Sequence, residues 1–117
     1  MILADTSLWV DHLRRGDADL SAWLEAGEVL SHPFVIGELA VGNLRHRERF
    51  LGHLQRLPRS VVASPAEVLT FISHEGLHGL GLGYVDVALL AAVRLTPAAV
   101  LRTRDRRLQA VADRLAA

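Results

Sequence analysis

Four acidic residues lie where a chain of alternating strands and helices would place functional carboxylates: Asp5, Glu38, Asp86 and Asp105. Asp5 ends a short apolar run, which is typical of a strand buried on both faces of a parallel sheet. Asp105 follows the last predicted strand, and ligands of open α/β sheets bind outside the carboxyl ends of the strands. If the first and last strands are neighbours, these two acids share one edge of the sheet. Glu38 and Asp86 then lie near the starts of helices that leave the same edge.

Each of these acids also has a purely structural explanation. Asp5 is a favoured N-cap for the helix that follows it, and for Asp5 alone the two explanations weigh equally. Asp86 would be an aspartate in the first turn of a helix, and Asp105 a cap after Thr103. Glu38 would be an exposed helix residue, but its neighbours three and four positions away are apolar residues or glycine. We therefore expect Glu38 to be partly enclosed.

Carboxylates that converge at one place need a cation. Two unit charges about 4 Å apart repel by roughly 4 kcal/mol at an effective dielectric constant of about 20, so such a cluster takes up protons or binds metal. Oxygen ligands without cysteine favour the hard ions Mg²⁺ and Mn²⁺. Such ions activate water and stabilise the leaving oxygen in phosphodiester hydrolysis. Thr6, Ser7 and Thr103 are candidates for orienting the acids or their bound water.

The composition limits the class of protein. A chain of 117 residues, half of them hydrophobic, is enough for one domain, so we expect residues 1–117 to fold around a single core. There is no cysteine, which excludes disulfides and thiolate metal sites. No apolar run reaches the length of a membrane span, and Asp5 comes too early for a secretory signal. A cytoplasmic protein without membrane association is the default expectation.

All thirteen basic residues are arginine, and the absence of lysine excludes P-loop phosphate binding and Schiff-base chemistry. The formal net charge is zero, so no overall positive field indicates nucleic-acid binding. The arginines nevertheless form three groups: Arg14-Arg15, then Arg45, Arg47, Arg49, Arg56 and Arg59, then Arg102, Arg104, Arg106 and Arg107. A solvated helix face is the commoner explanation of such a group. The bidentate guanidinium would also suit a phosphate backbone, for which the third group is the candidate.

The hydrophobic pattern predicts strands that alternate with helices. The expected strands are 1–4, 28–31, 61–63 and 99–102, and the expected helices are 8–13, 17–26, 33–43, 45–57, 65–75, 84–95 and 105–115. Residues 76–83, rich in glycine, are expected to form a loop. This alternation indicates an α/β fold with right-handed crossovers and a parallel sheet covered on both faces. The helix at 84–95 is apolar almost all round, so we expect it in the core.

At this level of detail the sequence resembles the PIN-domain ribonucleases, and most closely the VapC toxins of bacterial type II toxin–antitoxin modules. The segments that carry the resemblance span the chain: Ala4–Ser7, His32–Leu39, Gly81–Asp86 and Thr103–Leu108. Two places depart from the family pattern. Leu80 stands where an arginine is common, and Val87-Ala88 stands where members often have Ala-His.

The resemblance implies a three-layer α/β/α domain with a central parallel sheet of four strands, or five if the last edge strand of many relatives is present. It implies that Asp5, Glu38, Asp86 and Asp105 bind Mg²⁺ or Mn²⁺ and cleave RNA. It also implies a homodimer that a cognate VapB antitoxin neutralises. The hydrophobic content fits a small domain that leaves apolar surface for a partner.

Two other functions compete with this one. A PIN fold could serve as a non-catalytic partner-binding module, although an idle site has no reason to keep four repelling charges. His74-Glu75-Gly76-Leu77-His78 matches the HExxH pattern of zinc metalloproteases. That pattern needs one continuous helix to place both imidazoles on zinc, and Gly76 lies inside it. We therefore regard the protease as a remote alternative and expect both histidines to lie at the surface or in a loop near the mouth of the site.

Overall fold

A parallel sheet of three strands forms the centre of the fold. The computed structural model describes residues 1–117. The strands are β1 (Ile2–Ala4), β2 (Val29–Leu30) and β3 (Val100–Arg102). Their order is β2-β1-β3, with Leu3 opposite both Leu30 and Leu101. Because β1 has a neighbour on each side, Leu3 and Ala4 are fully buried, which accounts for the apolar run without polar alternation.

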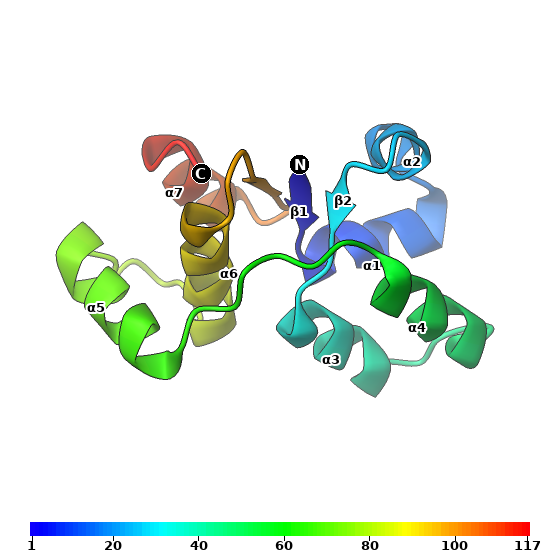
Figure 1. Cartoon of the computed structure of the whole chain (residues 1–117), viewed down its shortest axis with the longest axis horizontal. Coiled ribbons are helices and arrows are strands. Elements are labelled where there is room, and N and C mark those ends of the chain that lie inside the picture. Colours follow the sequence, from blue (N-terminus) through cyan, green and yellow to red (C-terminus); the bar gives the residue numbers. More distant parts are fainter.

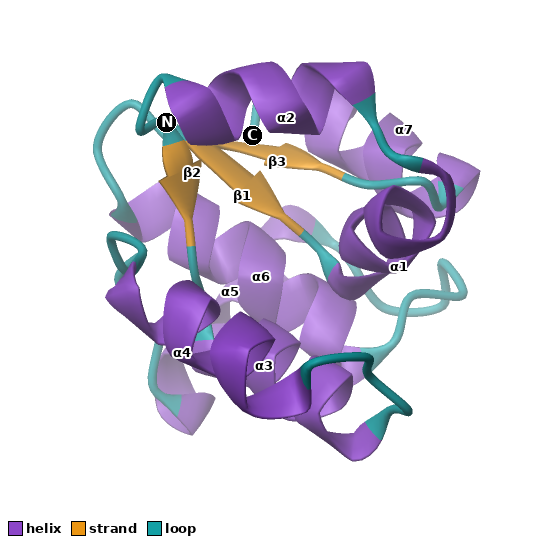
Figure 2. Ribbon diagram, turned by 90° about the vertical axis from the view of Figure 1, so that its right-hand side faces the viewer, coloured by secondary structure: helices purple, strands orange, loops and turns teal.

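Helices lie on both sides of this sheet. They are α1 (Thr6–Arg15), α2 (Ala18–Glu25), α3 (Pro33–Val41), α4 (Arg47–Arg56), α5 (Pro65–Glu75), α6 (Tyr84–Leu95) and α7 (Arg106–Arg114). Figure 2 shows α2 over one face of the sheet and α6 beneath the other. The predicted α/β class with a covered parallel sheet is therefore confirmed. The molecule measures 40 × 25 × 24 Å, and in Figure 1 α4 lies towards one end of the long axis while α5 and α7 lie towards the other.

Side-chain caps fix where several helices begin. The capping residues are Asp5 for α1, Asp17 for α2, His32 for α3, Ser64 for α5 and Asp105 for α7, each accepting a hydrogen bond from a backbone N–H of the first turn. Ser64 and Glu67 form a complete capping box. Two of the five caps are candidate site acids, so for Asp5 and Asp105 the structural role is real. A cap uses one carboxylate oxygen and leaves the other for further contacts.

Helix α6 is the central element of the core. Its residues Val87–Val93 are all buried, as the apolar pattern predicted, and it packs against β3 on one side and α5 on the other. The buried residues of the other elements join it in a single hydrophobic cluster. Asp86, the third residue of α6, comes directly before this buried run. The buried body of α6 therefore holds Asp86 in a fixed place at the edge of the core.

The predicted strand at 61–63 is wrong, and the sheet has three strands rather than four or five. The segment after α4 pairs with the chain next to β2 at a single parallel bridge, between Ser31, which follows β2, and Arg59. Immediately afterwards the N–H of Val61 donates to Thr96 Oγ1 (2.8 Å) at the end of α6, which draws the backbone away from the sheet. Val61 and Val62 are exposed. Val61 and Val62 are β-branched and so favour a strand, but no strand edge lies opposite them.

The structure contains no helix with the length and hydropathy needed to cross a lipid bilayer.

Candidate active site

The ends of β1 and β3 bring the first and last acids together, as the strand pattern predicted. Asp5 follows β1 directly and is buried, with 6 % of its surface exposed. Its Oδ1 accepts a hydrogen bond from the N–H of Leu8 (3.0 Å) at the start of α1. Asp105 lies just beyond β3, and its Oδ1 accepts from the N–H of Leu108 (3.0 Å) at the start of α7. Since β1 and β3 are parallel neighbours, both acids lie at the carboxyl edge of the sheet.

Two hydroxyl groups connect these strand ends around Asp5. Ser7 Oγ donates to Asp5 Oδ1 (2.7 Å), and Thr103 Oγ1 donates to Asp5 Oδ2. The two hydroxyl oxygens are themselves 3.1 Å apart. Thr103 Oγ1 also accepts from the N–H of Asp105 (3.0 Å), and Ser7 Oγ accepts from the N–H of Arg104 (2.9 Å). The hydroxyls expected to orient the acids therefore lie on Asp5 and tie it to the loop that carries Asp105.

Asp86 shares the electrostatic environment of these acids. One of its oxygens, Oδ2, accepts from the N–H of Gly83 (3.1 Å) at the start of α6. Partial burial raises the pKa of the Asp86 carboxyl above its ordinary value. The hydrogen bond from Gly83 opposes this rise, and the negative charges of Asp105 and Asp5 add to it. The carboxylates that follow β1 and β3 thus act on Asp86 at the start of α6.

Glu38 lies beside the start of α1 and is more exposed than the sequence predicted. It is exposed on α3, whose buried residues are Val35 and Leu39, so the expected apolar enclosure is wrong. The reason is that, of the apolar neighbours of Glu38 along the helix, only Val35 is buried, whereas Phe34 and Val41 are themselves exposed. Glu38 Oε1 instead accepts from Thr6 Oγ1 (2.6 Å), one residue after Asp5. Thr6, the third predicted hydroxyl, therefore links Glu38 to the start of α1.

The donor set suits a hard divalent cation, although the side chains do not form a finished metal centre. No group of three or more acidic or imidazole side chains is already arranged to hold an ion. Each carboxylate is instead hydrogen-bonded to a neighbouring N–H or O–H group. All the ligands on offer are oxygens, and a cation would offset both the burial of the Asp86 carboxylate and the negative charges of Asp105 and Asp5 that together raise its pKa. The residues therefore fit Mg²⁺ or Mn²⁺ by chemistry and location.

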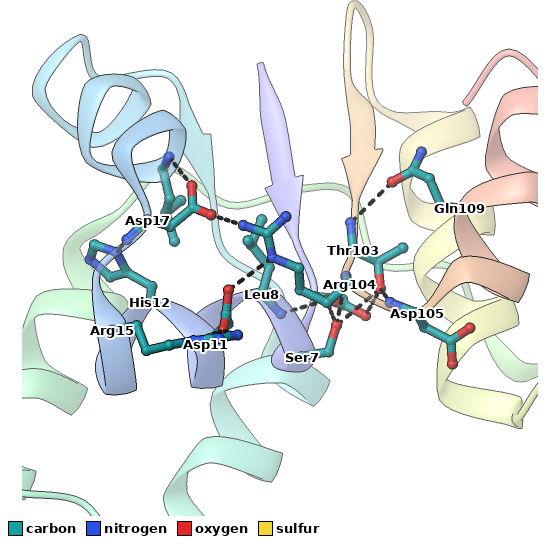
Figure 3. Close-up of polar contacts among 12 residues, drawn as sticks. Ser7, Leu8, Asp11, His12, Arg15, Asp17, Thr103, Arg104, Asp105 and Gln109 are labelled. Carbon is teal, nitrogen blue, oxygen red and sulfur yellow. Dashed lines mark hydrogen bonds and ion pairs between the residues drawn. The ribbon is translucent and has the colours of Figure 1, made fainter.

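Arg104, expected to contact RNA, is engaged within the protein. Its Nε donates to Asp11 Oδ2 (3.0 Å), and its Nη2 forms an ion pair with Asp17 (Figure 3). Asp11 also pairs with Arg15, and these hydrogen bonds lower the pKa of the Asp11 carboxyl. Asp17 uses its other oxygen to cap α2. Arg104 therefore anchors the β3–α7 loop to the junction of α1 and α2.

The other three arginines of this group differ in their contacts. Arg102 Nη1 donates to the carbonyl of Leu101 (2.9 Å), and Arg107 Nη1 lies 3.5 Å from the carbonyl of Gly81. Arg106 forms no ion pair and is exposed in the first turn of α7. Arg106 and Arg107 thus remain available at the mouth of the acidic site, whereas Arg104 is committed to its two aspartates.

Comparison with known proteins agrees with this architecture. The PIN domain family matches residues 2–114 of the chain. The chain belongs to the PIN-domain family. It is 46 % identical over 110 residues to proteins named Ribonuclease VapC32 from two strains of Mycobacterium tuberculosis, CDC 1551 and H37Rv, covering 94 % of this chain and 89 % of each relative. No solved structure shows a significant match. This is therefore a VapC-type PIN domain.

The HExxH pattern of this PIN domain is not a zinc site. Helix α5 ends at Glu75, and Gly76 adopts the left-handed conformation (φ +65°) that closes it. His78 lies beyond the helix end, so the two imidazoles do not share a helix face. Glu75 instead pairs with Arg94 on α6 (3.1 Å). Both histidines are exposed.

Sequence reasoning missed Asp11 and Asp17 as supports of the PIN-domain site. Asp11 is four residues before Arg15, a spacing that signals an ion pair on one helix. Asp17 lies at the start of the predicted second helix, and in the structure it is the N-cap of α2. Nothing local in either segment indicates that both acids would also bind Arg104, because that contact joins residues almost the whole chain apart.

Proposed function

We propose that this PIN domain is a toxic, metal-dependent endoribonuclease of the VapC type, neutralised by a VapB-type antitoxin. The observation that carries the proposal is the convergence of Asp5, Asp86 and Asp105 at the carboxyl edge of β1 and β3. The relatives named Ribonuclease VapC32 support RNA as the substrate. RNA phosphodiester hydrolysis is the reaction for which such an oxygen-rich cation site is suited.

The chain's own residues supply positioning and charge. Asp5, Glu38, Asp86 and Asp105 would hold Mg²⁺ or Mn²⁺, which when bound supplies an activated water and stabilises the leaving oxygen. Ser7 and Thr103 fix both oxygens of Asp5 through the hydrogen bonds that they donate. Thr6 fixes Glu38 in the same way. The buried position of Asp5 leaves it few other orientations, so it forms the rigid part of the site.

Metal removal tests this proposal. Purified protein is expected to cut single-stranded RNA with Mg²⁺ or Mn²⁺, to lose activity in a chelator, and to regain it when either ion is restored. Sequencing the new RNA ends identifies the cut position. A requirement for Zn²⁺ with Mg²⁺ inert would contradict the oxygen-ligand site, since Zn²⁺ prefers nitrogen and sulfur ligands.

Arg104 provides a test of the support around the site. Changing Arg104 to Gln is expected to slow cleavage roughly 10- to 100-fold, as loss of a supporting contact does at metal sites, and to raise the Mg²⁺ concentration needed for half-maximal rate. Asp17→Asn keeps the α2 cap but loses the ion pair, so it should reproduce the defect, and the double variant should be no worse. If Arg104 instead held RNA, Asp17→Asn would leave cleavage intact.

Apolar surface on α5 and beside it supports the proposed homodimer. Leu69, Val62 and Leu95 are exposed, at 62 %, 48 % and 42 % of their surface. Leu95 also lines a cavity of about 410 Å³ between α5 and α6, which includes Phe71. Apolar side chains gathered in this way are typical of a subunit interface. The mass of the protein in solution measures the oligomeric state, and a monomer at high concentration would contradict this part of the proposal.

We also propose a cytoplasmic location, where RNA and antitoxin are both present.

A further inference from the structure

Residues 45–59, which include α4, carry half of the arginines that form no ion pair with an acidic side chain. Residues 45–59 contain five arginines and one acid, Glu48, in a chain whose formal net charge is zero. Arg47 donates to the carbonyl of Ala40 at the end of α3. The other four arginines form no ion pair with any acidic residue. This segment is therefore a local positive patch that the overall composition conceals.

The free cations gather around one shallow hollow of about 410 Å³. It is lined by Arg45, His46, Arg49, Phe50, His53 and Arg56, which we call the α4 basic patch. Positions 46, 49, 53 and 56 are three or four residues apart, so they share one face of the helix. No acidic side chain lines the hollow. Phe50 forms its apolar floor and is held by edge-to-face contact with Trp9, with ring centroids 5.8 Å apart.

The α4 basic patch is continuous with the acidic site. Arg45 also lines a neighbouring cavity of about 430 Å³ between α1 and α3, which includes Arg14 and Asn43. The lining of that cavity also includes Thr6 and Glu38, the hydrogen-bonded pair in which Thr6 directly follows Asp5 in the chain. Figure 1 shows α3 and α4 side by side, with α1 next to them. This cavity, whose lining also includes the apolar residues Val10, Leu13, Leu39 and Leu44, thus links Glu38 to Arg45 of the α4 basic patch.

We propose that the α4 basic patch binds the phosphate backbone of the RNA strand outside the cleaved bond. The proposal rests on the proposed ribonuclease function. Arginine matches phosphate oxygens with a bidentate fork, and an aromatic floor between cations suits single-stranded nucleic acid, whose bases stack on rings. An acidic protein partner fits less well, because protein interfaces are anchored by buried apolar side chains and this hollow offers only Phe50.

Salt-dependent RNA binding tests the patch. Fluorescence anisotropy with a single-stranded RNA of about 15 nucleotides is measured in an Asp5→Asn background, so that no RNA is cut. Arg45→Gln/Arg49→Gln/Arg56→Gln is expected to weaken binding roughly tenfold or more, and to reduce the slope of log affinity against log salt by about 2, since each single-strand phosphate contact contributes about 0.7. The charge-preserving triple Arg→Lys variant should keep the slope.

Two single variants, one in the α4 basic patch and one far from it, provide the matched control. Arg49→Gln should lower the slope by about 0.7, whereas Arg114→Gln, on α7 towards the opposite end of the long axis, should not change it. In the active enzyme the triple Gln variant should raise KM for long RNA and keep kcat. Short oligonucleotides that fill the acidic site without extending to α4 should be cut at the same rate by the wild type and by the triple Gln variant.

The outcomes separate this inference from the function on which it rests. If the wild-type protein cuts no RNA, the ribonuclease proposal fails. If the wild type cuts RNA and the triple Gln variant binds it with unchanged affinity and salt slope, the patch proposal is overturned. Loss of antitoxin binding with RNA binding unchanged would also overturn it, because the patch would then be a protein-binding surface.

Discussion

Replacing Asp5 by Asn is expected to lower RNA cleavage by about 10³-fold, with little change in melting temperature. Asp5 is buried, and both of its oxygens accept hydrogen bonds from hydroxyl groups. Asn retains one oxygen, which can still accept from the N–H of Leu8, and Asn is as good an N-cap as Asp. The variant therefore removes the negative charge on which cation binding depends and keeps the local fold.

The rate of RNA cleavage at saturating Mg²⁺, together with a thermal melt, measures both parts of this expectation. Asp113→Asn is the matched control, since Asp113 is an exposed acid on α7 whose only side-chain partner is Gln109. It removes the same charge at a distance from the site and should leave cleavage unchanged. Full activity of the Asp5 variant would refute the proposed role of the carboxylates.

The sequence was sufficient to place Asp5 and Asp105 just beyond the ends of β1 and β3 because the determining signals are local. A strand buried on both faces reads as an unbroken apolar run, and a helix start reads as a cap. Asp5 and Asp105 carry both signals at once. The adjacency of their strands followed from the topology rules for α/β sheets, which restrict the choices to a few.

The features that sequence reasoning missed depend on contacts between distant segments. Val61 and Val62 have the propensity of a strand, but pairing requires an open edge, and the N–H of Val61 is taken by Thr96. Glu38 has apolar neighbours along its helix, yet which side of α3 faces the core is set by packing against α1 and α4. Arg104 looked like a surface cation because neither of its acidic partners is near it in sequence.

Replacing Asp86 by Asn is expected to stop cleavage almost completely, by about 10³-fold, and to stabilise the metal-free protein at neutral pH. Burial, Asp105 and Asp5 all raise the pKa of Asp86, which means that the fold disfavours its charged form. Asn has no charge to bury and can keep the hydrogen bond from the N–H of Gly83. Activity and stability should therefore change in opposite directions, as expected where function maintains a repulsive cluster.

The pH dependence of this difference gives the sharper test. Because the folded pKa of Asp86 lies above the ordinary 3.8, the folded wild type binds its proton more tightly than the unfolded chain does. Wild-type stability relative to Asp86→Asn is therefore highest below that ordinary value, falls as pH rises through the raised pKa, and is constant above it. Thermal melts of both proteins in chelator, from about pH 3 to about pH 8, measure this difference.

Mg²⁺ should restore stability to the wild type and not to the variant, since a bound ion stabilises only the protein that can hold it. If the Asp86→Asn variant is less stable than the wild type at neutral pH without divalent ions, Asp86 supports the fold. The prediction that the charged Asp86 destabilises the metal-free protein would then be wrong.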